Sequence, residues 1–300
     1  MTNQNAEQNR CGFVSVIGLP NAGKSTLVNA LVGAKVSIVS RKVQTTRARL
    51  LGMAIKGDTQ IVLIDTPGIF TPKKKLEQAM VDAALSSFDD ADFIVHLIDA
   101  SQKNAIENNR KIIEGLEGRN NVVLALNKID RVAKPDLLAL TQTLNDTFPY
   151  KDTFMISALD GRGIDDLGQY FAERLPEGPW LFPEDQISNA PLRLMAAEIT
   201  REKIFDRLHQ ELPYAIFVET EDWEQFDNGS VKIMQIVYVN RENQKGIVLG
   251  KGGSRIKTIG EAARAEIEEL IGTRVHLKIF VKVQENWAER TENYRLIGLE

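Results

Sequence analysis

The residues best suited to chemistry form one stretch near the amino terminus, Gly18-Leu19-Pro20-Asn21-Ala22-Gly23-Lys24-Ser25. It has the form G-x-x-x-x-G-K-S, follows an apolar run at 13–17 and precedes a helical pattern that starts at Thr26. Glycines let the backbone wrap around an anion, and the N–H groups that open the helix point at it. Lys24 is then expected to reach the β- and γ-phosphates of a nucleotide, and Ser25 to bind Mg²⁺. The expected phosphate-site residues are Gly18, Asn21, Ala22, Gly23, Lys24, Ser25 and Thr26.

A second motif indicates which base the nucleotide carries. Asn127-Lys128-Ile129-Asp130 follows an apolar strand pattern at 122–126. A carboxylate set edge-on to a purine accepts from guanine N1–H and the exocyclic amine, a donor pair that adenine lacks on that edge. A site built on a required hydrogen bond strongly rejects the analogue without it. Asp130 is the candidate carboxylate, Asn127 is expected to contact the base and brace the phosphate loop, and Lys128 to lie along the ring.

A third motif supplies an acid at the end of another strand. Asp65-Thr66-Pro67-Gly68 follows the strand pattern at 61–64. An acidic residue at the carboxyl end of a strand beside the phosphate loop is well placed to hold Mg²⁺, directly or through water. Gly68 offers a backbone N–H to the γ-phosphate and a hinge that moves when that phosphate leaves.

A threonine is expected to complete the magnesium shell. The segment Gln44-Thr45-Thr46-Arg47 lies upstream and shows no clear periodicity. One of its hydroxyls can bind the metal in the triphosphate state, and we favour Thr46 over Thr45. The predicted metal ligands are therefore Ser25, Thr46 and Asp65.

These motifs, together with Ser157-Ala158-Leu159 after the strand pattern at 153–156, resemble in order the G1 to G5 motifs of the translation-factor-related GTPases. The resemblance covers roughly the first 180 residues. It implies GTP or GDP and Mg²⁺ as cofactors. It also implies that the backbone of Ser157, Ala158 and Leu159 meets guanine O6.

The position that orients the attacking water in many GTPases is apolar here. Gly68 is followed by Ile69-Phe70-Thr71, and no side chain there can position water. The chain thus resembles the hydrophobic-substituted subgroup that lacks a catalytic glutamine, whose potassium-dependent members carry an asparagine where Asn21 lies. Asn21 capping the loop, or an RNA or protein partner supplying the missing group, are the alternatives. Slow intrinsic turnover and a switch role are expected, with catalytic roles for Lys24, Asn21 and Thr46.

Composition is that of a globular protein. The chain has 300 residues, of which 43% are hydrophobic and 26% charged. This length favours two domains. Because the net charge is −4, any nucleic-acid site is confined to a local patch. A single cysteine, Cys11, suits a reducing cytosol. No apolar run approaches the ~20 residues that span a bilayer, and the polar stretch 1–10 does not resemble a secretory signal. His96 lies in an apolar strand pattern and is expected in the core.

Strand patterns near 13–17, 61–64, 93–98, 122–126 and 153–156 alternate with helical ones. Alternation of this kind predicts an α/β domain, a mostly parallel sheet with helices on both faces and binding loops at the carboxyl ends of its strands. The segment 50–54 is expected to add an antiparallel edge strand. Prolines and a glycine between 175 and 183 predict a linker. The expected boundaries are a tail at 1–10, a GTPase domain at 11–178, a linker at 179–190 and a second domain at 191–300.

The second domain shows a helix–strand–strand–helix–helix–strand pattern. A helix is expected at 190–208, strands at 214–226 and 231–240 around the hairpin signal Asp227-Asn228-Gly229-Ser230, and a last strand at 274–283. Gly250-Lys251-Gly252-Gly253 separates the two later helices. This α+β order resembles a KH domain of the prokaryotic, type II topology, followed by a short helix around Trp287.

A G-x-x-G loop holds nucleic-acid backbone, because its glycines allow close approach and its N–H groups and lysine meet phosphates. Five basic residues against one acidic residue lie between Arg241 and Lys257, which favours single-stranded RNA. Ile247, Val248 and Ile256 form either an apolar floor for bases or an ordinary helix core. The expected RNA-binding residues are Gly250, Lys251, Gly252, Gly253, Arg255 and Lys257.

Along essentially its whole length the chain resembles the bacterial Era family of GTPases. The resemblance implies binding to the 3′ end of 16S rRNA, assistance in 30S subunit assembly and maturation, and a cytoplasmic location with peripheral contact to the inner membrane; no DNA is expected. One alternative is a GTPase that acts on transfer RNA, which normally needs a further catalytic domain. The other is a regulator read by protein or membrane partners, with the KH domain as scaffold.

Overall fold

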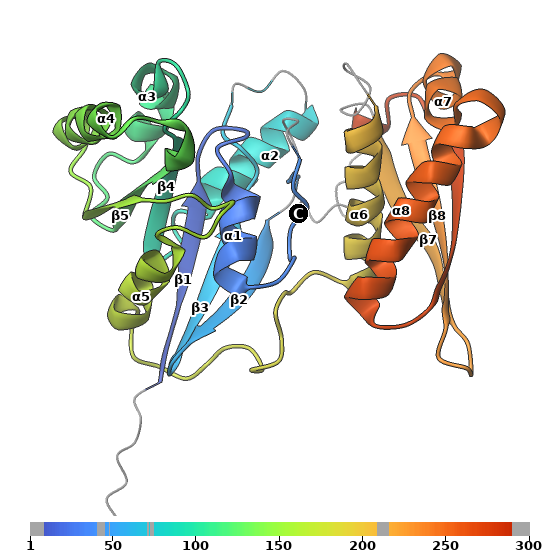
Figure 1. Ribbon diagram of the computed structural model, residues 1–300, viewed down its shortest axis with the longest axis horizontal. Coiled ribbons are helices and arrows are strands. Elements are labelled where there is room, and N and C mark those ends of the chain that lie inside the picture. The colour runs from blue at the N-terminus through green and yellow to red at the C-terminus, as the bar shows by residue number, and fades with distance from the viewer. Residues whose placement is uncertain are drawn as a thin grey trace, which may run out of the picture. The chain divides into compact units, whose positions relative to one another are not determined.

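The computed structural model describes residues 9–40, 46–47, 49–70, 72, 75–208 and 216–289 (Figure 1). Gln44, Thr45, Thr71, Tyr214 and the last part of the predicted second domain lie outside these residues. The chain forms two compact units, the larger built from residues 1–37, 46–72 and 80–189 and the smaller mainly from 190–300.

A six-stranded sheet organises the larger unit, in the order β2-β3-β1-β4-β5-β6. Its strands are β1 (Arg10–Ile17), β2 (Leu50–Lys56), β3 (Thr59–Asp65), β4 (Phe93–Asp99), β5 (Val122–Asn127) and β6 (Asp152–Met155). All neighbours pair in parallel except β2, which runs antiparallel to β3, so the predicted antiparallel edge strand is confirmed. The central strands are almost entirely buried, as expected for a parallel sheet covered on both faces.

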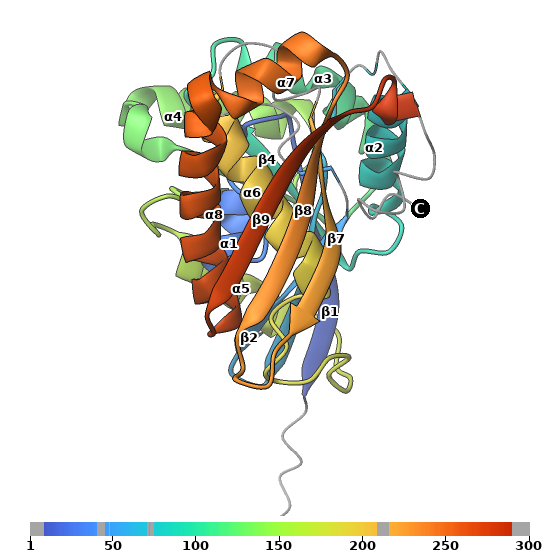
Figure 2. The same cartoon turned by 90° about the vertical axis from the view of Figure 1, so that its right-hand side faces the viewer.

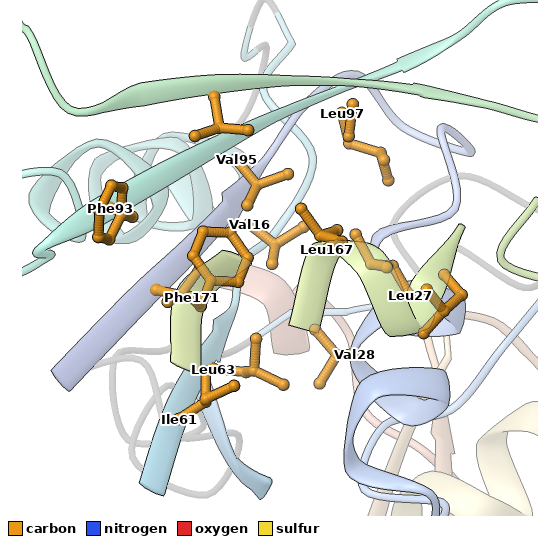
Figure 3. Close-up of a cluster of buried hydrophobic side chains, with 14 of the residues drawn as sticks. Val16, Leu27, Val28, Ile61, Leu63, Phe93, Val95, Leu97, Leu167 and Phe171 are labelled. Atoms are coloured by element: carbon orange, nitrogen blue, oxygen red, sulfur yellow. The ribbon is translucent and has the colours of Figure 1, made fainter. Parts of the chain in front are cut away.

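Helices cover both faces of this sheet. They are α1 (Lys24–Val32), α2 (Lys75–Ser86), α3 (Ala105–Gly115), α4 (Lys134–Thr147) and α5 (Ile164–Arg174), with a 3₁₀ turn η1 (Ile129–Arg131). Side chains of α1 and α5, such as Leu27 and Phe171, pack on one face in a buried cluster with Val95 (Figure 3). Ile94 and Ile98 point to the other face and pack with α3 and α4, because successive strand residues alternate sides. The predicted α/β fold is confirmed.

The sheet topology decides where the candidate site lies. Since β1, β3, β4, β5 and β6 are mutually parallel, their carboxyl ends share one edge. The loops that leave this edge contain the phosphate-loop motif after β1, the Asp65–Gly68 motif after β3, the Asn127–Asp130 motif after β5 and the Ser157 motif after β6.

The smaller unit is a three-stranded sheet packed against helices (Figure 2). Its elements are α6 (Leu192–Arg207), β7 (Phe217–Gln225), β8 (Val231–Val239), α7 (Glu242–Leu249), η3 (Lys251–Gly253), α8 (Ser254–Ile271), β9 (Val275–Val283) and η4 (Trp287–Glu289). Strand β7 pairs antiparallel with β8, and β8 pairs parallel with β9. The element order matches the type II KH pattern, so that prediction is confirmed.

The hairpin between β7 and β8 follows the expected turn chemistry. Gly229 has φ 80°, and Phe226 N donates to Ser230 O at 2.9 Å. All three helices contribute to cores on one face of the sheet: Ala197, Val248 and Ile259 pack with strand residues. Among the described residues, no helix is long and apolar enough to cross a membrane.

Candidate functional site

The loop after β1 has a backbone that only glycine fits at two positions. A Cβ on Gly18 would lie 2.3 Å from the carbonyl oxygen of Leu97, and one on Gly23 would lie 2.3 Å from Nδ2 of Asn127. Gly23 has φ 103° and caps α1, so the N–H groups of the first helical turn face the concave side of the loop. This arrangement is an anion cradle at a helix amino terminus.

Lys24 is buried within this loop. Its Nζ donates to the carbonyl oxygens of Gly18 at 3.2 Å and Leu19 at 3.0 Å. Burial lowers the pKa of Lys24 to about 8, against a smaller raising effect of the Asp65 carboxylate. An anion seated in the loop would favour the ammonium form, so the site is poised for a phosphate oxygen.

Three oxygen-bearing side chains from separate segments meet beside Lys24. Ser25 Oγ lies 2.8 Å from both Asp65 Oδ2 and Thr46 Oγ1, and Thr46 Oγ1 donates to the same carboxylate oxygen at 3.1 Å. Asp65 is fully buried, which raises the pKa of its carboxyl, although several hydroxyls lower it. A buried carboxylate with two hydroxyls is an all-oxygen set that suits Mg²⁺.

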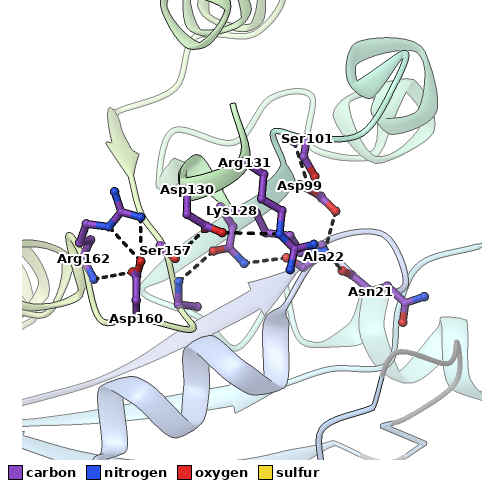
Figure 4. A network of polar contacts seen from close by, with 12 residues as sticks. Asn21, Ala22, Asp99, Ser101, Lys128, Asp130, Arg131, Ser157, Asp160 and Arg162 are labelled. Carbon is purple, nitrogen blue, oxygen red and sulfur yellow. Dashed lines mark hydrogen bonds and ion pairs between the residues drawn. The ribbon is translucent and has the colours of Figure 1, made fainter. Parts of the chain in front are cut away.

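The Asn127–Asp130 motif joins three loops. Asn127 Nδ2 donates to Ala22 O at 2.8 Å, and its Oδ1 accepts from Ala158 N at 3.0 Å. Ser157 donates to Asp130 Oδ1 at 2.8 Å, and this hydrogen bond holds the pKa of the Asp130 carboxyl below its usual value (Figure 4). Asp130 is therefore an anion held by the loop after β6, while Asn127 links the same motif to the phosphate loop.

Lys128 is held by a carboxylate that the sequence analysis missed. Its Nζ donates to Asn21 O at 2.8 Å and to Asp99 Oδ2 at 2.6 Å (Figure 4). Asp99 ends β4, and Ser101 also donates to it. The available signal was an acidic residue at the end of the strand pattern at 93–98, the same argument that singled out Asp65.

The segment after β3 approaches the phosphate loop closely. Thr66 Oγ1 donates to Val16 O at 2.7 Å, and Ile69 N donates to Gly18 O at 3.1 Å. A Cβ on Gly68 would lie 2.9 Å from Pro20 atoms. The Ile69 side chain packs against the apolar cluster around Ile17.

The loop after β6 presents backbone to the same edge. Leu159 is 78% exposed, so its side chain does not serve the core. Arg162 donates to Asp160 and holds the pKa of that carboxyl at about 2. The sequence analysis assigned no role to either charged residue, because both follow the Ser157-Ala158-Leu159 motif.

The glycine-rich loop of the smaller unit is open. Gly250, Gly252 and Gly253 all have positive φ, but only a Cβ on Gly250 would meet neighbours, those of Arg255. Arg255 donates to Ile247 O and thus ties α8 to α7. Lys251 and Lys257 are exposed.

A groove of about 290 Å³ lies between α8 and β9. It is lined by Ile256, Lys257, Gly260, Glu261, Arg264, Leu277 and Ile279. Ile256 lines this groove and also packs against the core cluster of the smaller unit, so both interpretations of Ile256 stay predictions. Val248 does not line the groove, since it is fully buried in the core with Ile259, and Ile247 is 46% exposed away from the lining.

Most of the groove-lining residues were missed by the sequence analysis. Gly260 and Arg264 follow Ile256 at four-residue spacing on α8, and Leu277 and Ile279 alternate along β9. Helical and strand periodicity were therefore the signals available.

The nucleotide cradle, the oxygen cluster and the two units together define a P-loop GTPase joined to a KH domain. A family model described as 50S ribosome-binding GTPase matches residues 13–128, and a KH domain model matches residues 211–288.

Curated relatives and solved structures give the family. GTPase Era of Afipia carboxidovorans is 55% identical over 100% of this chain and 97% of its own length, and GTPase Era of Brucella suis biovar 1 is 57% identical over 98% and 95%. A crystal structure of Era in complex with MgGDPNP and nucleotides 1506–1542 of 16S ribosomal RNA matches with a TM-score of 0.90 at 40% identity, covering 97% of this chain and 99% of the other. A single-substitution variant of Aquifex aeolicus Era bound to GDP·AlF4⁻ gives 0.89 at the same identity and coverage. The chain belongs to the Era GTPase family.

Proposed function

We propose that this protein is a GTP-binding and GTP-hydrolysing switch that binds the 3′ end of 16S rRNA and assists assembly of the small ribosomal subunit. The observation that carries the proposal is the meeting of Lys24, the Ser25–Thr46–Asp65 oxygen cluster and Asp130 at one edge of the sheet. The Era structure with MgGDPNP and 16S rRNA nucleotides supports the same ligands for this chain.

The phosphates are held by the backbone N–H groups of the loop and by Lys24. On binding, Lys24 Nζ would exchange the carbonyls of Gly18 and Leu19 for phosphate oxygens. Ser25, Thr46 and Asp65 would hold Mg²⁺, which when bound neutralises charge on the β- and γ-phosphates. Thr46 reaches this cluster from a separate segment, so its engagement can report the γ-phosphate.

Base selection rests on Asp130. Ser157 already occupies its Oδ1, so the carboxylate is oriented before the base arrives. A guanine adds two N–H donors to this carboxylate, while adenine would cover it without supplying either donor. Asn127 links this loop to the phosphate loop, and Lys128 is steadied by Asp99.

Hydrolysis is proposed to be slow without a partner. The side chain of Ile69, packed against the core, replaces a polar group that would orient water. Asn21 is proposed to help bind a potassium ion at the phosphates, with Lys24 and Thr46 as the other catalytic residues. A monovalent cation there would offset developing charge, as an arginine finger does.

RNA is proposed to bind at the open glycine-rich loop and along the adjoining groove. Gly250, Gly252 and Gly253 allow close approach of a backbone, and Lys251, Arg255 and Lys257 supply positive charge. The floor of Ile256, Leu277 and Ile279 offers apolar contact to bases, with Arg264 at its rim. We place the protein in the cytoplasm; the peripheral membrane contact implied by the family remains a prediction.

The decisive test is GTP hydrolysis in K⁺ and in Na⁺, each with and without RNA carrying the 16S 3′ end. We expect faster hydrolysis in K⁺ and a further increase with that RNA but not with a scrambled one. If neither RNA changes the rate while GTP is still cleaved, the coupling between RNA and hydrolysis is wrong, and a switch read by protein or membrane partners becomes the better account. Equal rates in K⁺ and Na⁺ would remove the potassium role alone.

A further inference from the structure

The carboxylate at the end of β4 has hydrogen-bond partners on both oxygens (Figure 4). Asp99 Oδ1 accepts from Ser101 N at 3.0 Å and from Ser101 Oγ at 2.6 Å, while its Oδ2 accepts from Lys128 Nζ at 2.6 Å. The two bonds from Ser101 fix the carboxylate, so that Oδ2 is held toward Lys128. The two charged side chains are only 17% and 24% exposed, so solvent screens their attraction less than that of a surface pair.

Sheet register brings the two charged residues together. Asp99 lies opposite Asn127 in the parallel pairing of β4 with β5, and Ala100 N donates to Asn127 O at 2.9 Å. Lys128 comes next and has φ 64°, in the left-handed region that is unfavourable for a residue with a side chain. Such a conformation persists where surrounding contacts fix it, and it occurs frequently at ligand sites.

The same ammonium group reaches the phosphate loop. Lys128 Nζ donates to Asn21 O at 2.8 Å, and Asn127 Nδ2 donates to Ala22 O at 2.8 Å. Two consecutive side chains of the Asn127–Asp130 motif therefore hold two consecutive carbonyls of the loop. Asn21 is itself left-handed, with φ 63°, so these contacts support a bend of the loop that is unfavourable by itself.

We infer that Asp99 is a positioning residue for nucleotide binding: it holds Lys128 across the phosphate loop and, through Lys128, keeps the bend at Asn21 in place. The inference rests on the proposed function, and Asp99 contacts no nucleotide in this role. A lysine that is already ordered need not be immobilised when the ligand arrives. Immobilising one long side chain on binding lowers affinity by up to about tenfold.

The test is the release of a fluorescent GDP from the full-length protein. In Asp99→Asn the amide has one acceptor oxygen in place of two, so it cannot accept from both Ser101 N and Lys128. We expect GDP to leave this variant about tenfold faster than the wild type. Because Asp99 acts through Lys128, adding Asp99→Asn to Lys128→Met should change release no further. Thermal unfolding shows that each variant is folded.

A matched control separates this effect from the loss of any aspartate–lysine pair in the larger unit. Asp165 Oδ1 lies 3.1 Å from Lys56 Nζ, and among the described residues it has no contact with the phosphate loop or the Asn127–Asp130 motif. Asp165→Asn should release GDP at the wild-type rate.

Two results would overturn the inference while leaving the proposed function intact. One is an unchanged release rate in Asp99→Asn. The other is the same acceleration by Asp99→Asn in the wild-type and Lys128→Met backgrounds, because Asp99 would then act on the turn at Ser101 and not through Lys128. If the wild-type protein does not retain GDP, the proposed function fails and the inference fails with it.

Discussion

Both units place a glycine-rich loop directly before a helix, and we propose that both loops bind phosphate through backbone N–H groups and a lysine. Gly23 caps α1 and Gly253 caps α8, each with positive φ. In the larger unit the loop is crowded: a Cβ on Gly23 would strike Asn127, and Lys24 is 7% exposed. In the smaller unit a Cβ on Gly253 would meet nothing within 4 Å, and Lys251 is exposed.

The difference shows that two loops of similar composition can suit ligands of different size, depending on how deeply each loop is buried. A buried loop excludes water, so each of its contacts is strong and specific for one compact ligand. An open loop makes weaker, solvent-screened contacts and accepts a long polymer by adding several of them. We therefore expect the crowding around each glycine-rich loop, rather than the loop sequence, to separate the proposed nucleotide site from the proposed RNA site.

The largest loss of ligand affinity is expected when alanine replaces the glycine that caps α1, and the same change at the cap of α8 is the matched comparison. Gly23→Ala should weaken GTP binding by roughly 100-fold or more, because the added Cβ displaces Asn127 as well as straining the backbone. Gly253→Ala adds only the strain of a left-handed residue, about 1 kcal/mol, and should change RNA affinity about fivefold or less. Calorimetric titration with each ligand makes the comparison. Equal losses in the two variants would remove the argument from crowding.

Acid should weaken the larger unit first, through His96. Its Nδ1 lies 2.8 Å from Tyr150 OH and its Nε2 3.1 Å from Asn109 Oδ1, so the neutral ring suffices for both contacts. Burial lowers the pKa of His96 to about 4, below the 6.5 of an unfolded chain. The unfolded state therefore binds the proton first, and stability falls as the pH drops from 6.5 toward 4, by about 3 kcal/mol at most.

Hydrogen exchange measured by mass spectrometry at pH 7 and pH 4.5, corrected for intrinsic rates, can separate the two units. Protection in β4 and β5 should fall more than protection in β8. His96→Gln should reduce the difference between the two pH values. A uniform loss over both units would argue against His96 as the sensitive group.

Replacing Gly260 with alanine is expected to have a smaller effect, which raises the stability of the smaller unit and lowers its RNA affinity. A Cβ there would lie 3.6 Å from Ile279 Cδ1, an ordinary contact, so Gly260→Ala fits inside the groove. Alanine should stabilise α8 by up to ~1 kcal/mol, while the added methyl displaces a base and lowers RNA affinity about fivefold. Thermal unfolding and RNA titration check the two effects. Unchanged RNA affinity would place the bases outside this groove.

The smallest effect is expected at the exposed lysine. Lys251→Ala should lower RNA affinity a few-fold and reduce the slope of log affinity against log salt by about one, as for loss of a single phosphate contact. GTP affinity serves as the internal control and should not change. A full loss of RNA binding would contradict the prediction, because it would show that Lys251 contributes far more to affinity than one solvent-exposed phosphate contact.

Local sequence chemistry carried the fold class and the element order. The strand–loop–helix around Gly18–Ser25 and the order of elements in the second domain depend on short-range signals, namely apolar periodicity and the positions of glycine, which can be read directly from a sequence. Val248 shows the limit of that reasoning. Periodicity marked it as apolar but could not tell a groove floor from a core, and the structure places it in the core.

What the sequence alone determined was the set of chemical groups: a phosphate-loop motif with Lys24 and Ser25, an acid at Asp65, a second acid at Asp130 that we predict to select guanine, and a basic glycine-rich loop. What only the tertiary structure decided was which residues lie next to these groups. Asp99 beside Lys128, Thr46 beside Asp65 and Leu277 in one groove with Gly260 bring together residues that are distant in the chain. Such contacts follow from how strands align and helices dock, and no pattern within one segment encodes the spacing between segments.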